Sequence, residues 1–243
     1  MNVLFDTEAT ISHSVRNSMF GLRKRVFCDD LGWDIPHYDG LEADIYDFSS
    51  SYYVNIVDSA GSLLGSVRLM PMKQDNLMAT VFKDSFEGNY EPDQATRTVW
   101  EATRLCINEE HVPSCKRSDM TLKLLMGLFN TCKAVGIKHI MCNCNSGVLR
   151  VYKRLGLSID NIGSTMKHQS RAVHCIAVEI SRKNIDALAQ QAADRKLDWP
   201  DIEGLGIEQA RKYINPSVNV PQDLSHLLND RLFNSSYSTL SLN

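Results

Sequence analysis

Apolar residues recur along the chain at two different spacings, and these predict alternating helices and strands. Val15, Met19, Leu22 and Val26 follow one another at steps of four, three and four residues, the spacing of one face of an α-helix. Short runs rich in Val, Ile, Tyr and Leu between turn residues predict β-strands instead. The expected helices cover residues 13–27, 118–135, 146–155, 184–196 and 206–213, and the expected strands cover residues 51–57, 63–70, 98–107, 139–144 and 172–180. This order is typical of a mixed α/β fold.

Polar residues at the ends of these segments predict where two of the helices begin and end. Ser118 is expected to cap the long helix, and Gly136 is expected to stop it. Either Asn145 or Ser146 is expected to cap the next helix. Residues 28–48 show no periodicity but are rich in aromatic and aliphatic side chains, so we expect an ordered loop folded over another part of the protein.

Composition and charge narrow the classes of protein that the chain can belong to. Of its 243 residues, 43% are hydrophobic and 23% are charged, which excludes global disorder. The 26 basic and 29 acidic residues argue against nucleic acid as a partner. No apolar run is long enough to span a bilayer, and residues 1–11 lack the basic start of a signal peptide. Seven cysteines without such a peptide indicate reduced thiols and a cytoplasmic protein. No metal site is expected, because the closely spaced Cys142 and Cys144 lack a second ligand pair.

Charged residues stand inside two of the apolar strands. Arg68 lies in the strand expected at residues 63–70, and Glu101 and Arg104 lie in the strand expected at residues 98–107. A charge in such a position is costly unless it has a partner or a ligand. One interpretation is a buried salt-bridge network, for instance Arg23 with Asp47 and Arg68 with Glu101. The alternative interpretation is a ligand site.

The spacing of Glu101 and Arg104 raises a geometric difficulty. Side chains alternate between the two faces of a regular strand, so residues three apart point in opposite directions. If both residues serve one site, the strand needs a β-bulge. We therefore predict a bulge near Ala102 and Thr103.

Five segments carry a resemblance to a known family. They are Leu22-Arg23-Lys24-Arg25-Val26-Phe27, Gly32-Trp33, Glu42-Ala43-Asp44-Ile45-Tyr46-Asp47, Gly65-Ser66-Val67-Arg68-Leu69 and Trp100-Glu101-Ala102-Thr103-Arg104. In this order and at this spacing they resemble the acyl-homoserine-lactone synthases, which make quorum-sensing autoinducers. The resemblance implies an α/β, N-acetyltransferase-like fold: a mixed, twisted sheet with helices on both sides and a V-shaped cleft between central strands. It also implies a synthase domain over residues 1–199. Residues 200–243 would be a C-terminal extension, a short helix followed by a mobile tail.

The family reaction implies an enzyme that uses S-adenosylmethionine as a substrate and needs no cofactor. It joins S-adenosylmethionine to an acyl thioester by forming an amide, and then closes the lactone and releases methylthioadenosine. By resemblance, Glu101 is the expected catalytic base, acting directly or through water. The residues expected to bind S-adenosylmethionine or orient the loop are Arg23, Phe27, Trp33, Asp44, Asp47, Arg68, Thr103 and Arg104. Within this set, the aspartates suit the cationic groups of S-adenosylmethionine, the arginines its carboxylate, and the aromatic rings its adenine or sulfonium.

The acyl group and its carrier call for two further sets of residues. The residues expected in the acyl pocket are Leu122, Leu125, Met126, Met141, Cys142 and Cys144. The residues expected to dock an acidic acyl carrier protein are Lys133, Lys138, Arg150, Lys153 and Arg154. Residues 108–117 lack the glycines with which relatives of this fold bind the pyrophosphate of coenzyme A, which favours carrier protein as the donor. Acyl-coenzyme A stays possible.

Two other functions remain open at the level of sequence. A different N-acyltransferase on the same fold would use another amine and release no methylthioadenosine. If the chain is a non-catalytic binding protein on this fold, variants with Glu101 or Asp47 replaced should fold normally and keep their function.

Overall fold

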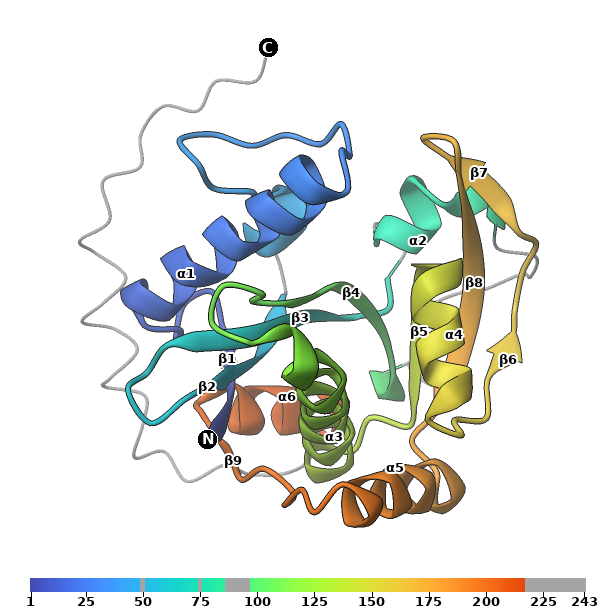
Figure 1. The fold of residues 1–243 in the computed structure, drawn as a ribbon. Helices are drawn as coiled ribbons and strands as arrows, with labels where there is room; N and C mark the ends of the chain where they lie inside the picture. Colours follow the sequence, from blue (N-terminus) through green and yellow to red (C-terminus); the bar gives the residue numbers. More distant parts are fainter. Residues whose placement is uncertain (49–50, 74–75, 86–96, 217–243) are drawn as a thin grey trace.

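One twisted, mixed β-sheet forms the centre of the protein (Figure 1). The computed structural model describes residues 1–48, 51–73, 76–85 and 97–216. The strands within these residues are β1 (Asn2–Thr7), β2 (Tyr52–Val57), β3 (Leu63–Pro71), β4 (Val99–Ile107), β5 (His139–Asn145), β6 (Asp160–Asn161), β7 (Met166–His168), β8 (Arg171–Glu179) and β9 (Ile202–Glu203). Across the sheet they follow the order β6-β8-β5-β4-β3-β2-β1-β9, and β7 pairs with β8.

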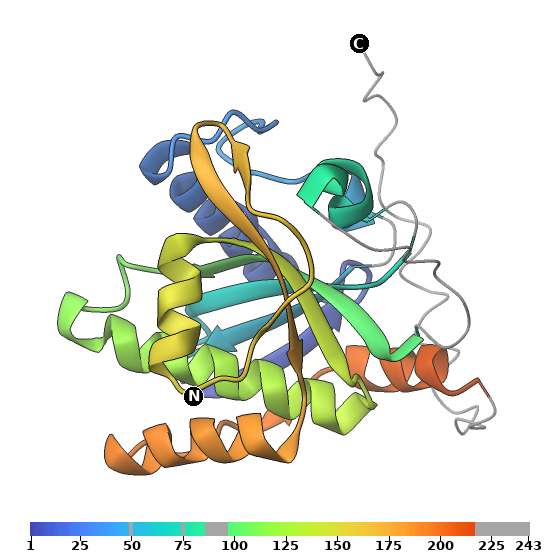
Figure 2. The same cartoon turned by 90° about the vertical axis from the view of Figure 1, so that its right-hand side faces the viewer.

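Helices cover both faces of this sheet (Figures 1 and 2). The α-helices within the described residues are α1 (His13–Arg23), α2 (Leu77–Thr80), α3 (Arg117–Val135), α4 (Ser146–Arg154), α5 (Arg182–Asp194) and α6 (Gly206–Ile214). Helix α1 packs on one face around Met19 and Tyr53. Helices α3, α5 and α6 pack on the opposite face around Phe129, Leu188 and Ala210. The chain also contains the π-helix Lys24–Asp30 and the 3₁₀ turns Ile45–Phe48, Lys83–Ser85 and Ser114–Lys116.

The sheet opens between the neighbouring strands β4 and β5. These two strands are parallel and pair only at Val99 with His139, Trp100 with Ile140, and Glu101 with Met141. Beyond Glu101 both strands continue, to Ile107 and Asn145, without pairing with each other. The predicted V-shaped opening is therefore confirmed, and it begins directly after Glu101.

The predicted β-bulge is also present, and it lies slightly further along β4. Between two of its pairs with β4, strand β3 advances two residues, from Ser66 to Arg68, while β4 spans three, from Cys106 to Thr103. Arg104 supplies the irregularity with a φ of 56°. Left-handed backbone is unusual for a residue that is not glycine. The bulge turns Arg104 towards the cleft side of the sheet, where it meets Phe27 and Glu42.

Several predicted boundaries differ from the structure. Strand β1 was not predicted, because a single short segment that contains Asp6 gives no clear alternation. The first helix leaves α-geometry at Lys24 and continues as a π-helix to Asp30. The prediction of Ser118 as a cap was wrong, since α3 begins at Arg117 after a 3₁₀ turn and Ser118 lies inside it. The prediction that Gly136 stops α3 is confirmed, with a φ of 95°.

The strong cap of α4 fixes the turn that follows β5. The Asn145 side chain accepts hydrogen bonds from the backbone N–H groups of Gly147 and Val148. Two otherwise unpaired donors of the first helical turn are thereby satisfied. Of the two predicted caps, Asn145 is the one used.

Residues 200–214 belong to the same core as the preceding chain. Strand β9 pairs in parallel with β1, and Gly204 lies with a φ of 125° against the backbone of Phe5. Ala210 of α6 is fully buried in the cluster of α3. The first part of the predicted extension thus completes the sheet, whereas the predicted mobile tail lies outside the described residues. Among the helices that the structure describes, none is long and apolar enough to cross a membrane.

Candidate active site

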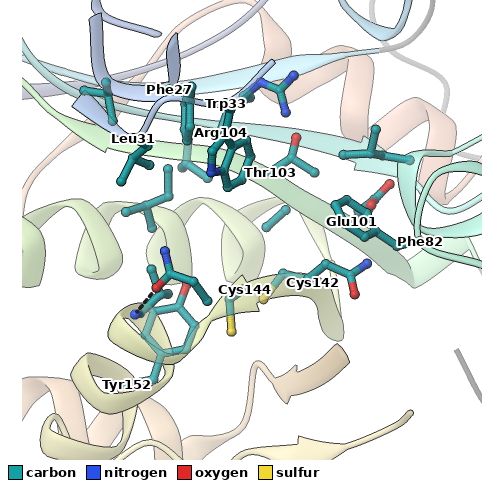
Figure 3. A pocket seen from close by; sticks show the side chains of 18 residues that line it. Phe27, Leu31, Trp33, Phe82, Glu101, Thr103, Arg104, Cys142, Cys144 and Tyr152 are labelled. Atoms are coloured by element: carbon teal, nitrogen blue, oxygen red, sulfur yellow. Dashed lines mark hydrogen bonds between the residues drawn. The ribbon is translucent and has the colours of Figure 1, made fainter. Parts of the chain in front are cut away.

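A cavity occupies the opening between β4 and β5 (Figure 3). Phe27, Leu31, Trp33 and Arg104 lie at one end, and Glu101 and Phe82 lie at the other. Cys142, Cys144 and Tyr152 form the facing wall. The cavity is thus bounded by the π-helix, the loop after it, and the two strands that separate.

The aromatic end of the cavity is held from both sides. The rings of Phe27 and Trp33 lie 5.3 Å apart, and the imidazole of His168 meets Trp33 edge-on at 6.4 Å. At the tip of the β7–β8 hairpin, the side chain of Gln169 accepts from the backbone N–H of Asp34 and donates to its carbonyl. The loop expected to fold over another part of the protein therefore bridges α1 and this hairpin.

A buried ion-pair network lies behind this end of the cavity, and Arg23 is its inner member. Arg23 is 1% exposed. Its Nε donates to Glu42 at 2.5 Å, and its two terminal nitrogens donate to the two carboxylate oxygens of Asp47 at 2.8 and 2.9 Å. Tyr53 and the backbone N–H of Asp44 donate to Asp47 as well. The predicted pair of Arg23 with Asp47 is confirmed.

Arg68 and Arg104 extend the network to the cavity wall. Arg68 donates to both carboxylate oxygens of Asp44 and to the hydroxyl of Thr103. Arg104 donates to Glu42 at 2.9 Å and to Asp44 at 3.0 Å, and its guanidinium lies 5.4 Å over the Phe27 ring. Arg68 thus orients the loop, as expected, but through Asp44 and Asp47; the pair with Glu101 that was offered as an example does not occur among the described residues.

The network keeps its carboxylates charged. Burial opposes the ionisation of Asp47, but the charge and hydrogen bonds of Arg23 outweigh it and lower the pKa of Asp47. The charges of Arg23 and Arg104 likewise overcome burial and lower the pKa of Glu42. The carboxylates in turn raise the pKa of Arg23 against its own burial.

The network divides the residues predicted to bind S-adenosylmethionine into two groups. Phe27, Trp33, Thr103 and Arg104 line the cavity. Arg23, Asp44, Asp47 and Arg68 stand behind its wall, and the carboxylate of Asp47 is 0% exposed. Their geometry favours orientation of the loop over contact with a ligand. The carboxylate of Asp44 keeps 13% of its surface exposed.

Glu101 stands apart from this network at the other end of the cavity. Its Oε1 accepts from the backbone N–H of Met78 at 2.9 Å, and its Oε2 has no hydrogen-bond partner among the described residues. Burial raises its pKa to about 7, although Asn76, Arg68 and backbone N–H groups oppose this shift. A carboxylate of this kind takes up or releases a proton near neutral pH, as a general base requires.

Of the six residues predicted for the acyl pocket, two line this cavity. Cys142 and Cys144 line the cavity, and the hydrogen bond between them raises the pKa of Cys142 and lowers that of Cys144. Leu122, Leu125 and Met126 do not line it, because α3 packs them into the core beneath the sheet. Met141 does not line it either, since its side chain packs against Met72, Met78 and Cys175.

The predicted docking residues share one property. Each of them is exposed, namely Lys133, Lys138, Arg150, Lys153 and Arg154. Arg150 and Arg154 lie one helical turn apart on α4, directly after the strand that forms one wall of the cavity. Their role in docking stays a prediction.

Sequence reasoning left out the lining residues Leu31, Phe82 and Tyr152, and also two residues whose polar groups are buried. Glu42 is fully buried and bridges Arg23 and Arg104. Its position two residues before Asp44 in the acidic loop was an available signal. Asn143 lines the cavity beside Cys142 and Cys144, and its buried amide nitrogen has no partner among the described residues. No sequence pattern distinguished it from its neighbours.

Comparison with known proteins gives consistent matches. The family model described as autoinducer synthase matches residues 7–188. An acyl-homoserine-lactone synthase from Aeromonas hydrophila is 32% identical over 166 residues, which cover 68% of this chain and 79% of the relative.

Two solved structures are similar in fold. A CoA-dependent acyl-homoserine lactone synthase, solved with SAM and isopentyl-CoA, aligns with a TM-score of 0.72 at 19% identity, over 86% of this chain and 98% of that one. An N-acetyltransferase from Lactobacillus plantarum aligns with a TM-score of 0.51 at 14% identity, over 74% of this chain and 98% of that one. The predicted N-acetyltransferase-like fold class is confirmed.

The raised pKa of Glu101 predicts how stability depends on pH. The folded protein holds a proton on Glu101 up to a pH of about 7, while an unfolded chain releases it near 4.5. The folded state therefore loses stability as pH rises between these values, by an amount of order 2–3 kcal/mol. Glu101→Gln removes this loss. We expect the variant to unfold at a higher temperature than the wild type at pH 8 and at the same temperature at pH 4. Equal differences at both pH values would contradict a buried, titrating Glu101.

Proposed function

Since the chain belongs to the autoinducer synthase family, we propose that it acylates the amine of S-adenosylmethionine with an acyl thioester and then closes the homoserine lactone. Members of this family are acyltransferase-type enzymes. One observation carries the proposal for this chain. The cavity has an aromatic and guanidinium end at Phe27, Trp33 and Arg104, and a carboxylate that titrates near neutral pH, Glu101, at the other end.

Charge balance supports S-adenosylmethionine as the amine substrate. The three arginines and three carboxylates of the network cancel one another. Ionised Glu101 then leaves the cavity with one net negative charge. S-Adenosylmethionine carries a sulfonium, an ammonium and a carboxylate, so its net charge is complementary. Phe27 and Trp33 offer aromatic faces for the adenine or the sulfonium, and Arg104 offers donors for the carboxylate.

The first step is acyl transfer. Glu101 takes a proton from the α-ammonium group, directly or through a water, and the free amine attacks the thioester carbon. Its raised pKa suits this role, because the group is partly ionised at neutral pH and binds a proton strongly enough to remove one. Collapse of the tetrahedral intermediate forms the amide and releases the carrier thiol.

The second step is ring closure. The carboxylate oxygen of the acylated substrate attacks its own γ-carbon, and methylthioadenosine leaves. A sulfonium is already a good leaving group, so this step depends mainly on holding the two reacting atoms close together. The packed rings of Phe27 and Trp33 and the fixed guanidinium of Arg104 provide such a rigid surround.

We further propose that acyl carrier protein is the acyl donor. An acidic carrier needs a basic surface, and the exposed residues Arg150, Lys153 and Arg154 lie on α4, which packs against the cavity through Tyr152. Residues 108–117 lack glycine, which weakens the usual backbone cradle for the pyrophosphate of coenzyme A.

Product analysis tests the proposed reaction. Purified protein supplied with S-adenosylmethionine and a series of acyl thioesters is expected to release methylthioadenosine and an acyl-homoserine lactone in equal amounts. Glu101→Gln, which keeps the shape of the side chain, is expected to lower kcat by roughly 10²–10⁴-fold, because the base is lost. Acylation of a different amine without methylthioadenosine would contradict the proposal. Unchanged turnover in Glu101→Gln would reject Glu101 as the base.

Charge reversal on α4 tests the donor. Arg150→Glu combined with Arg154→Glu is expected to raise the KM for acyl carrier protein by roughly tenfold, with a smaller effect at high salt, because surface charges steer association. The KM for the matching acyl-coenzyme A is expected to change little. Lys212→Glu, an exposed reversal on α6, serves as the control. Equal effects of both variants, or turnover with acyl-coenzyme A alone, would contradict a carrier protein docked on α4.

A further inference from the structure

Two buried polar atoms without a partner lie on the walls of one cavity. They are Oε2 of Glu101 and Nδ2 of Asn143, neither of which has a hydrogen-bond partner within the described part of the chain. A buried donor or acceptor left unpaired costs about 1–3 kcal/mol. An unpaired acceptor and an unpaired donor in one cavity indicate a ligand that supplies a hydrogen-bond donor for Glu101 and an acceptor for Asn143.

The sheet places both atoms on the same face. Glu101 is opposite Met141 in the last pair before β4 and β5 separate. Side chains of a strand alternate, so Asn143, two residues beyond Met141, shares the face of Met141. The amide of Asn143 therefore extends from β5 on the same face as the carboxylate of Glu101 on β4, two residues further into the opening.

One short segment fixes both side chains. The backbone N–H of Met78 donates to Oε1 of Glu101 at 2.9 Å. The hydroxyl of Ser85 donates to Oδ1 of Asn143 at 3.0 Å; its single proton then cannot bond the Phe82 carbonyl, which lies 2.7 Å away. Residues 77–85 thus engage one oxygen of each group. The remaining polar atom of Glu101, Oε2, is a hydrogen-bond acceptor, and the remaining polar atom of Asn143, Nδ2, is a donor.

We propose that Nδ2 of Asn143 donates a hydrogen bond to the carbonyl oxygen of the acyl thioester and to the oxyanion that forms from it. This inference rests on the proposed acyl transfer. The thioester carbon then lies between an amine that Glu101 deprotonates and a carbonyl oxygen that Asn143 binds. Donors placed where negative charge develops contribute strongly to catalysis when water is excluded.

The electrons and protons of the step balance. The amine nitrogen forms a bond to the carbonyl carbon, and the π-electron pair moves to the oxygen held by Asn143. The pair returns as the carbon–sulfur bond breaks. The nitrogen loses two protons in all: Glu101 takes the first before the attack and passes it to solvent, and it takes the second after the carbon–nitrogen bond has formed and passes it to the leaving thiolate. Asn143 exchanges no proton and acts only as a donor.

Kinetics of two matched variants test this role. Asn143→Asp keeps the size of the side chain and an oxygen for Ser85 but offers no N–H. We expect kcat to fall by roughly 10²–10³-fold with the KM for S-adenosylmethionine unchanged. Ser85→Ala breaks the same contact and leaves the donor in place, so we expect it to lose less than about tenfold. Equal losses in both variants, or no loss in Asn143→Asp, would overturn the proposal.

Binding of unreactive donors gives a second measurement that needs no turnover. A ketone analogue, with CH₂ in place of the thioester sulfur, keeps the carbonyl oxygen, and a thioether analogue lacks it. Asn143→Leu is expected to weaken the ketone by about tenfold or more and to leave the thioether unchanged. Equal weakening of both analogues would overturn the role of Asn143. If the wild type releases no methylthioadenosine with any donor, the proposed function fails; if it does and Asn143→Asp matches it, only this inference fails.

Discussion

The buried contact between Arg23 and two carboxylates is the constraint on which the rest of the site depends. Arg23 ends the α-helical part of the first helix, and Glu42 and Asp47 lie in the loop that returns to the sheet. A guanidinium in this position is tolerated only with charged partners, and removal of one partner typically costs 3–5 kcal/mol. The contact therefore fixes the path of the loop, and Asp44 and Arg104 then join it to the bulged strand.

The ion-pair network and Glu101 lie at different ends of the cavity, so the residues that shape the binding wall are separate from the proposed base. The ion pairs of the network balance one another, and the arginines lower the pKa of Glu42 and of Asp47, so these two carboxylates stay ionised over the physiological pH range. Glu101 lies at the opposite end, without an ion-pair partner, and burial moves its pKa into the neutral range. The pKa shifts of Glu42 and Asp47 are thus opposite to that of Glu101, because the first two carboxylates form ion pairs with arginines and Glu101 does not.

Much of this organisation could be predicted from the sequence. Charges inside apolar strands indicated a site, and the spacing of Glu101 and Arg104 required the bulge that the structure contains. Periodicity could not show that α3 turns Leu122, Leu125 and Met126 into the core, because an apolar residue suits a core and a pocket equally well. It also could not identify Asn143, which lines the cavity and is held there by Ser85, 58 positions away in the chain. Pairings at such separations depend on the tertiary fold.

If the buried network holds the wall of the cavity in place, the affinity of Glu42→Gln for S-adenosylmethionine must fall below that of the wild type. Glu42 bridges Arg23 and Arg104 without touching the cavity, so a neutral amide leaves both guanidiniums without full compensation. Glu110→Gln, which loses an exposed pair with Arg25, is the matched control. In titration calorimetry we expect at least tenfold weaker binding for Glu42→Gln and unchanged binding for Glu110→Gln. Wild-type affinity in a folded Glu42→Gln variant would contradict it.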